Sequence, residues 1–312
     1  MAGVAVLAGG VGAARLLTGM VRAVPPAEVT AIVNVGDDTV LHGLSISPDL
    51  DTVVYTVAGA IDPERGWGLR DESWQAMATL ERYGGLTWFG LGDRDLGTHL
   101  YRTGRLASGA TLSEVTGEIA RAWGLELSVL PVSDDPVRTL LTLASGDQAG
   151  TEVAFQDYFV RMQHSVAVSS VRISGAASAA PAPGVLAALA SADAVVVAPS
   201  NPIVSIGPVM AVPGVLEAVT ARRSSVVAVS PLVGGKALKG PADRLMRELG
   251  HEDSVVGVAR LYAPYVGTLV IDVADAGLAR EVEAEGLRCV VTDTIMRDPA
   301  AAADLCKVAL GR

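Results

Sequence analysis

The stretch VTAIVNVGDDTVLHGLSISPDLDTVVY, residues 29–55, combines the features from which the fold of this chain can be predicted. Its first five residues form an apolar run that is typical of a buried strand, and its last residues have the pattern of a helix. A long polar loop lies between them. A strand that feeds a polar loop before a helix is characteristic of an open α/β sheet, which holds its ligands at the carboxyl ends of its strands.

This loop and the start of the helix carry four carboxylates, Asp37, Asp38, Asp49 and Asp51. Carboxylates crowded into one loop repel one another unless a cation or a proton intervenes, so the group favours an oxygen-rich site for magnesium (Mg2+). His42 adds a further polar side chain that could contact a substrate. The alternative is that these aspartates cap turns and start the helix at Asp51, which is a common use of Asp.

The composition restricts the class of protein. At 312 residues, half of them hydrophobic, the chain is long enough for a large core, and its few aromatic residues suit parallel strands covered by Val, Ala and Leu on both faces. A net charge of −10 argues against nucleic acid or an anionic membrane as a partner. The start lacks a basic leader and no apolar run reaches about 18 residues, so we expect a cytoplasmic protein.

A glycine-rich turn, AGGVGAAR at residues 8–15, follows the first apolar run. Backbone N–H groups at the start of a helix form an anion site. The motif is weak as a dinucleotide fingerprint, because Arg15 replaces the third glycine and the second strand ends in Asn34 instead of an acid. We therefore expect a phosphate or another anion near Gly10, Gly12 and Arg15; the alternative is a tight turn with a surface arginine.

Two later loops also follow apolar runs and contain groups that bind nucleotides. The loop PSNPIVSIGP can hydrogen-bond a base or a phosphate, and the loop GGKALKG, which holds two of the three lysines, suits phosphate. The alternatives are a proline-shaped helix entry for the first loop and a solvated surface for the second. The predicted nucleotide-binding residues of these loops are Ser200, Asn201, Ser205 and Lys236.

Tryptophans and arginines gather in DPERGWGLRDESW and WFGLGDRD, within a chain that has only four tryptophans. Indole faces stack on flat rings and arginines pair with phosphate, so we predict substrate contacts at Trp67, Trp88 and Arg94. His99 follows on the next predicted helix. The alternatives are a loop fixed by tryptophan packing and a structural histidine.

The order of apolar runs divides the chain. RTLLTL, TEVAFQDYFV and SVAVSSVRIS read as successive strands without helices between them, so we place a strand-rich insertion or subdomain at residues 131–180. Residues 1–130 and 181–312 alternate strands with helices. The predicted fold class is α/β, with a Rossmann-like, doubly wound, mostly parallel sheet and a smaller α/β insertion. We predict the strands of the main sheet at 4–7, 29–33, 127–130, 194–198, 226–229, 268–273 and 288–292, and a further short strand in TWFGL.

Taken in order, these motifs resemble the 2-phospho-lactate transferase family. The resemblance runs through AGGVGAAR, NVGDD, SPDLDT, ERGWG, WFGLGDRD, VSDDPVRT, FQDYFV, APSNPIVSIGP and SPLVGGKALKGPAD, across nearly the whole chain. It implies a Mg2+-dependent enzyme, usually a homodimer, that transfers a phospholactyl or phosphoenolpyruvyl group. The implied donor is a guanosine diphosphate adduct, the acceptor is the ribityl hydroxyl of the deazaflavin precursor Fo, and GMP is released. WFGLGDRD resembles the actinobacterial branch, for which the enolpyruvyl donor is expected.

The resemblance also implies roles for particular residues. Asp37 and Asp51 would be the magnesium ligands or the acids nearest the accepting hydroxyl, with Asp38 and Asp49 in support. The diphosphate would meet Gly10, Gly12 and Arg15, guanosine would meet Ser200, Asn201 and Ser205, and the flat ring would lie against Trp67 and the residues from Trp88 to Arg94. Two other classes stay open: a non-enzymatic regulator of the same superfamily that binds UDP-sugars, and a nicotinamide oxidoreductase.

Overall fold

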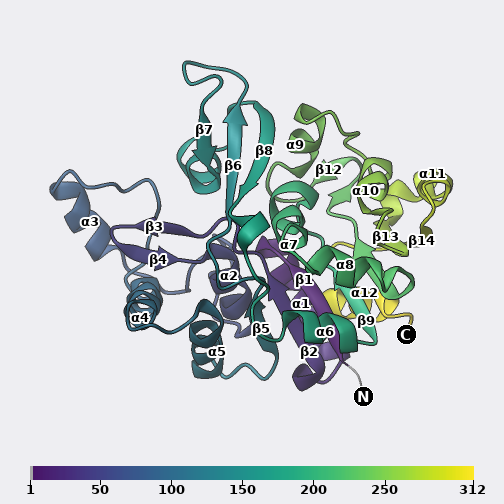
Figure 1. Cartoon of the computed structure of the whole chain (residues 1–312), viewed down its shortest axis with the longest axis horizontal. Coiled ribbons are helices and arrows are strands. Elements are labelled where there is room, and N and C mark those ends of the chain that lie inside the picture. Colours follow the sequence, from purple (N-terminus) through teal and green to yellow (C-terminus); the bar gives the residue numbers. More distant parts are fainter. Residues whose placement is uncertain (1–2) are drawn as a thin grey trace.

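Seven parallel strands form the central sheet of the molecule, in the order β14-β13-β10-β9-β1-β2-β5 (Figure 1). The computed structural model describes residues 3–312. The apolar runs predicted all seven strands, with bounds that differ by no more than one residue. The strands are β1 (Val4–Ala8), β2 (Val29–Val33), β5 (Ser128–Pro131), β9 (Ala194–Val197), β10 (Val226–Val229), β13 (Thr268–Asp272) and β14 (Arg288–Thr292).

Helices cover both faces of this sheet. The crossovers from β1 to β2 and from β9 to β10 run in opposite directions across the sheet. Because such parallel crossovers are right-handed, they place α1 and α8 on opposite faces. Helix α1 packs against α2 and α12, whereas α8 packs against α6. The bounds are α1 (Gly10–Ala23), α2 (Pro48–Val57), α6 (Val185–Ser191), α8 (Val215–Thr220) and α12 (Pro299–Ala309). The predicted doubly wound α/β class is confirmed.

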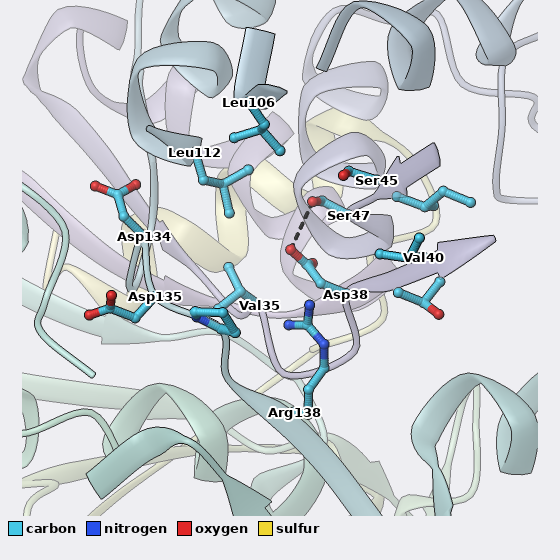
Figure 2. A pocket seen from close by; sticks show the side chains of 13 residues that line it. Val35, Asp38, Val40, Ser45, Ser47, Leu106, Leu112, Asp134, Asp135 and Arg138 are labelled. Atoms are coloured by element: carbon cyan, nitrogen blue, oxygen red, sulfur yellow. Dashed lines mark hydrogen bonds between the residues drawn. The ribbon is translucent and has the colours of Figure 1, made fainter. Parts of the chain in front are cut away.

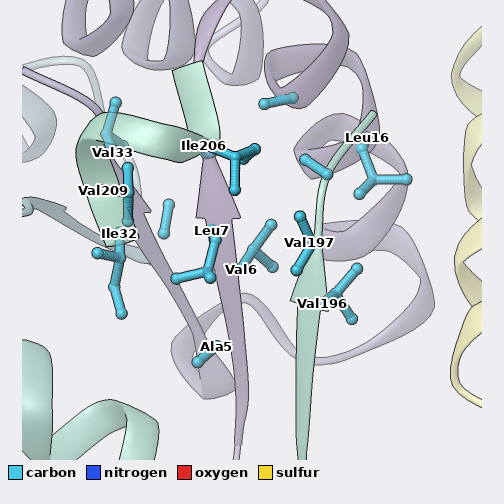
Figure 3. Packing of buried hydrophobic residues seen from close by; sticks show 14 of the residues in the cluster. Ala5, Val6, Leu7, Leu16, Ile32, Val33, Val196, Val197, Ile206 and Val209 are labelled. Carbon is cyan, nitrogen blue, oxygen red and sulfur yellow. The ribbon is translucent and has the colours of Figure 1, made fainter. Parts of the chain in front are cut away.

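The core lies between the sheet and these helices (Figure 3). Every residue of β1 is buried, and Val6 and Leu7 are fully covered by side chains of the neighbouring strands and helices. A central parallel strand is buried on both faces, which is why its sequence is continuously apolar instead of alternating. Because the chain has few aromatic residues, small aliphatic side chains, mainly Val, Ala and Leu, fill the space between the sheet and the helices.

A second sheet of three antiparallel strands rises from the first at the top of Figure 1. It consists of β6 (Arg138–Leu143), β7 (Glu152–Ala154) and β8 (Val168–Ser174). The prediction of a strand throughout TEVAFQDYFV is wrong, because a π-helical turn at Asp157–Arg161 follows β7. This turn places the buried Tyr158 ring in a small core with side chains of β6 and β8. The domain boundaries at 131 and 180 stay a prediction.

A small lobe follows β2 and lies at the left of Figure 1. It contains the hairpin β3 (Thr39–Leu41) and β4 (Leu44–Ile46) and the helix α3 (Gln75–Arg82). The strand predicted in TWFGL is absent: Leu91 instead packs with Ile46 and Met77, so this segment is fixed by side-chain packing. Helix α2 begins at Pro48 and not at Asp51, because proline is well suited to a first helical turn.

The remaining elements connect these parts. A capping box of Thr111 and Glu114 begins α5. None of the helices in residues 3–312 has the length and apolar composition needed to cross a bilayer. The further elements are α4 (Asp95–Ala107), α5 (Leu112–Ala122), α7 (Gly207–Met210), α9 (Ala242–Glu248), α10 (Val255–Tyr262), α11 (Ala279–Ala284), β11 (Leu232–Val233) and β12 (Lys236–Ala237).

The order of the strands determines where a ligand can bind. The chain continues from β1 to β2 on one side, whereas β9 and β10 lie on the other side of β1. In open α/β sheets such a reversal leaves a crevice at the carboxyl ends of the strands. The loops that follow β1, β2, β9 and β10 all begin at this edge, and they include the glycine turn, the carboxylate loop and both predicted nucleotide loops.

Candidate functional site

Asn34, the first residue after β2, holds two carboxylates of the central loop. Its Nδ2 group donates to Asp37 Oδ1 at 3.1 Å and to Asp49 Oδ2 at 3.0 Å. Its Oδ1 accepts the backbone N–H of Gly36 at 2.7 Å, which fixes the orientation of the amide. Asn34 is 1% exposed. Its buried, neutral amide group therefore binds the carboxylates of Asp37 and Asp49 side by side.

Asp37 and Asp49 are both buried, and this makes their negative charges costly. Burial, the neighbouring Asp49 and then Asp38 raise the pKa of Asp37 well above its usual value. Burial raises the pKa of Asp49 to about 6, against the opposing effects of the Asn34 hydrogen bond and the Gly10 backbone N–H. A proton or a cation between these carboxylates would relieve the cost.

Asp38 faces the opposite side of the loop, toward a cavity of about 150 Å³ (Figure 2). Its Oδ2 accepts the hydroxyl of Ser47 at 2.8 Å, whereas Oδ1 is buried without a hydrogen-bond partner. Burial raises the pKa of Asp38 to about 7. Leu106 and Leu112 form an apolar wall of the cavity, and Arg138 approaches Asp38 from β6. The cavity can therefore hold an apolar group next to a hydroxyl.

Asp51 lies in a buried ion pair. Its two carboxylate oxygens accept two hydrogen bonds from the guanidinium of Arg102, which is 1% exposed. His99 is also buried: its Nδ1 lies 3.8 Å from Asp51 Oδ2, and its Nε2 lies 3.3 Å from Asp95 Oδ2. The hydroxyl of Tyr55 donates to Asp95 Oδ1 at 2.7 Å. This network joins helices α2 and α4, and it supports the structural alternative for His99.

The glycine turn after β1 packs tightly against the loop after β9. A Cβ atom on Gly9 would lie 2.7 Å from the Cβ of Ser205, and one on Gly12 would lie 2.4 Å from the carbonyl oxygen of Pro199. The hydroxyl of Ser200 donates to the carbonyl of Gly9 at 2.7 Å. Glycine is therefore required here because the two loops touch.

Asp49 also reaches this turn. Its Oδ2 lies 3.1 Å from the position of a Cβ on Gly9, and its Oδ1 lies 3.5 Å from that of a Cβ on Gly10. Gly10 begins helix α1, and the Gly9 residue that precedes the helix makes no side-chain cap. The carboxylate of Asp49, which belongs to α2, thus lies at the positive end of α1, whereas Arg15 is exposed one turn further on.

The other predicted nucleotide residues lie at the same sheet edge. Asn201 Oδ1 accepts the backbone N–H groups of Ile203 and Val204 and so caps the π-helical turn Pro202–Ile206, as the helix-entry alternative expects. Lys236 is exposed in the short hairpin of β11 and β12. These positions leave the binding of a nucleotide there as a prediction.

The aromatic residues of the small lobe form a separate group. Trp67 and Trp74 pack edge to face at 6.0 Å, and the Arg65 guanidinium lies 5.5 Å and 5.2 Å from their ring centres. Trp67 is 44% exposed. Arg161, in the π-helical turn after β7, lies 6.0 Å from the ring centre of Trp88. Tryptophan packing, the alternative reading of this loop, thus explains part of the pattern.

Two further predicted substrate residues are exposed at the borders of the lobe. His42 occupies the tip of the β3-β4 hairpin with a φ of 54°, a conformation that the turn requires. Arg94 precedes helix α4 and donates to the carbonyl of Arg70 at 2.7 Å. Neither side chain makes a described contact with the Asp37–Asp49 pair.

Comparison with known proteins agrees with this architecture and assigns the chain. The family model described as 2-phospho-L-lactate transferase CofD matches residues 4–309. The chain belongs to this family. Proteins named "Phosphoenolpyruvate transferase" match along their length: that of Kitasatospora aureofaciens is 44% identical and covers 97% of this chain and 95% of its own, and that of Streptomyces griseus is 44% identical with 98% and 97% covered. That of Mycobacterium avium is 40% identical, with 98% and 97% covered.

Solved structures confirm the fold of this family member. Two crystal structures of a Bacillus halodurans protein, one titled as a member of the upf0052 family, superpose with TM-scores of 0.61 and 0.64. The first covers 97% of both chains and the second 99%, each at 18% identity. At this identity the likeness concerns the fold alone.

The carboxylate loop of this transferase-family chain offers two carboxylates as magnesium ligands. Among residues 3–312, no group of three or more His, Cys, Asp or Glu side chains is arranged to hold a metal. Mg2+ is commonly bound by one or two carboxylates together with substrate phosphates and waters. Asp37 and Asp49 provide such a pair, whereas Asp51 is engaged with Arg102.

Sequence reasoning missed four residues of this site: Asn34, Arg102, Arg138 and Gln156. Asn34 directly follows a predicted strand and precedes Asp37 by three residues, and this position is a usable signal. Gln156 donates from its Nε2 to the backbone carbonyl of Asp37 at 3.2 Å, across 119 residues of sequence. No local pattern could have identified that contact.

Proposed function

We propose that this chain transfers a phosphoenolpyruvyl group from a guanosine diphosphate adduct to the ribityl hydroxyl of Fo, with release of GMP, in deazaflavin coenzyme biosynthesis. The family supports a transferase of this type, and the relatives named "Phosphoenolpyruvate transferase" favour the enolpyruvyl over the phospholactyl donor. One observation carries the proposal: Asn34 joins Asp37 and Asp49 at the crevice beside the start of α1.

The reaction makes demands that these residues can meet. Attack of a hydroxyl on a diphosphate needs alignment and charge neutralisation more than covalent help. Mg2+ supplies that neutralisation when it is bound, and we assign it to Asp37 and Asp49. The backbone N–H groups from Gly10 to Gly12 would meet the diphosphate. The loop from Ser200 to Ser205, which touches this turn, would then lie next to the guanosine.

The acceptor has a natural place on the other side of the carboxylate loop. The cavity beside Asp38 has apolar walls and a polar end, and it is too small for a whole tricyclic ring with its side chain. We therefore place one part of the acceptor there, with its ribityl chain extending past the loop so that the hydroxyl reaches the diphosphate beside Gly10. The exposed Trp67 and the half-buried Trp88 are candidates for contact with a ring that extends from the cavity.

Asp51 has a different task in this proposal from the one expected of it. Its bonds to Arg102 and the contact of His99 engage it in a buried network. Because Asp49 and Asp51 share the first turns of α2, this network positions Asp49. We therefore assign Asp51 and His99 as positioning residues. The homodimer and the cytoplasmic location stay predictions.

The test is a mass-spectrometric assay of purified protein with Fo, magnesium and each guanosine donor in turn. We expect GMP and the phosphodiester product with the enolpyruvyl donor, and no product after addition of EDTA. Asp37→Asn is the matched inactive variant. If neither donor gives product while the protein is folded and binds a UDP-sugar, the regulator alternative replaces this proposal.

A further inference from the structure

The carboxylate of Asp49 occupies a place where the proposed function needs an anion to bind. Its two oxygens lie against Gly9 and Gly10, at the start of a helix of 14 residues that has no side-chain cap of its own. A helix N-terminus attracts negative charge and offers free N–H groups, so an internal carboxylate can satisfy it. In this structure the chain supplies that anion itself.

Asp49 is held there from two sides. Asn34 Nδ2 donates to its Oδ2 at 3.0 Å, and the side chain is 6% exposed. It belongs to the first turn of α2, which is fixed by the buried Asp51–Arg102 pair two residues later. The carboxylate therefore cannot move far from the turn when a ligand arrives.

A diphosphate at the same turn would meet this carboxylate at close range. Two negative charges a few ångströms apart in a partly buried site repel strongly. A divalent cation shared by the carboxylate and the phosphate turns this repulsion into a bridge. Asp37 stands on the other side of Asn34, where it can contribute to holding the same cation.

We propose that Asp49 makes binding of the donor diphosphate depend on the metal: without a divalent cation it excludes the diphosphate from the start of α1, and with the cation it helps to hold it. This rests on the proposed function. The residue then acts as a selector for the metal complex of the nucleotide. The negative charge of Asp49 causes this metal dependence, and the volume of its side chain does not.

This proposal predicts that removal of the Asp49 carboxylate strengthens the binding of GDP when no metal is present. In EDTA at about pH 8.5, where Asp49 is ionised, Asp49→Asn will bind GDP at least about tenfold more tightly than the unaltered protein, because the isosteric amide removes the opposing charge. With Mg2+ present, the unaltered protein will bind GDP as tightly as the variant or more tightly. Isothermal titration calorimetry with GDP measures both states without any turnover.

Asp38→Asn is the matched control at about pH 8.5, above the pKa of both acids, since it then removes the same charge from the same loop but from a side chain that faces Ser47 and the cavity. If it gains as much metal-free affinity as Asp49→Asn, the effect is only one of net charge and the inference is wrong. An unchanged metal-free affinity in Asp49→Asn also overturns it, while the proposed function stands. If neither protein binds GDP with or without Mg2+, the proposed function fails together with it.

A second variant and a second measurement cover a failure of Asp49→Asn to fold. Asp49→Ala tests the same charge without the amide, and thermal unfolding establishes that each variant is folded. Electron paramagnetic resonance of Mn2+ gives an independent readout. In the unaltered protein GDP will tighten Mn2+ binding, and in either Asp49 variant this coupling will fall by about tenfold or more. Equal coupling in both proteins would contradict the inference.

Discussion

The guanidinium of Arg102 and the carboxylate of Asp51 form a two-bonded ion pair that is almost completely shielded from water. Arg102 belongs to α4 and Asp51 to α2, so the pair joins α4 to the helix that carries Asp49. A buried charge is tolerated only when it is paired, and each partner here depends on the other.

Removal of one partner should therefore be costly. We expect Arg102→Met to lower the free energy of unfolding by about 3–5 kcal/mol, because Asp51 keeps a buried charge without its partner. Chemical denaturation with urea measures the change. The double variant Arg102→Met/Asp51→Leu should recover part of the loss. Arg247→Met, which breaks the exposed pair with Asp253, is the control and should cost less than about 1 kcal/mol; an equal cost in both variants would contradict the prediction.

Asp38 should give the stability a particular dependence on pH. Its pKa is raised to about 7 in the folded chain, so between about pH 4 and 7 the folded state keeps a proton that the unfolded state has lost. The stability from this group is full below about pH 4 and is lost as the pH rises to 7. In metal-free buffer Asp38→Asn should thus be the more stable protein above pH 7, by on the order of a few kcal/mol, and the difference should shrink toward pH 4. Thermal unfolding across this range provides the measurement, and a difference that is constant with pH would refute the assignment.

Asp37 should be required for the effect of magnesium on stability. A ligand that binds only the folded state at about 100 times its Kd stabilises it by about 2.7 kcal/mol. We expect added Mg2+ to raise the unfolding temperature of the unaltered protein and to leave that of Asp37→Asn unchanged. Asp304→Asn, at an exposed position on α12, is the control and should respond to Mg2+ like the unaltered protein. A full response in Asp37→Asn would remove Asp37 from the metal site.

The glycine turn offers a test of close packing. In Gly12→Ala the added Cβ would lie 2.4 Å from the carbonyl oxygen of Pro199, so the turn and the loop after β9 must separate. We expect a loss of about 1–3 kcal/mol and weaker GDP binding. Gly104→Ala is the control, since it lies inside α4 with no atom near the added Cβ, and it should gain about 0.5–1 kcal/mol. Denaturant unfolding of both variants checks the opposite signs.

Much of the fold could be predicted because its signals are local. The strand Val29–Val33 is apolar at every position except Thr30, as expected of a parallel strand that is buried on both faces. The cap at Thr111 is a short-range pattern for the same reason. TWFGL has the composition of a strand but not the structure of one, because the packing of Leu91 in the small lobe decided its conformation.

The site could be predicted only as a set of residue types. The sequence showed the four aspartates as a group but not the partner of each one. Asp37 and Asp49 share Asn34. Asp38 faces a cavity, and Asp51 is paired with Arg102. That division depends on contacts between segments far apart in the chain. A pattern of residue types gives the chemistry, and the tertiary fold determines which group each acid meets.

Strand β1 lies between β2 and β9. During synthesis of the chain, β2 is produced early and β9 much later. When a ribosome has produced the first half of the chain, β1 has one neighbour, and its other edge waits for residues 194–197. An open apolar edge is prone to wrong pairing. Fragments that end before β9 are therefore expected to aggregate, and the nascent protein gains its anion site only after two thirds of it has been synthesised.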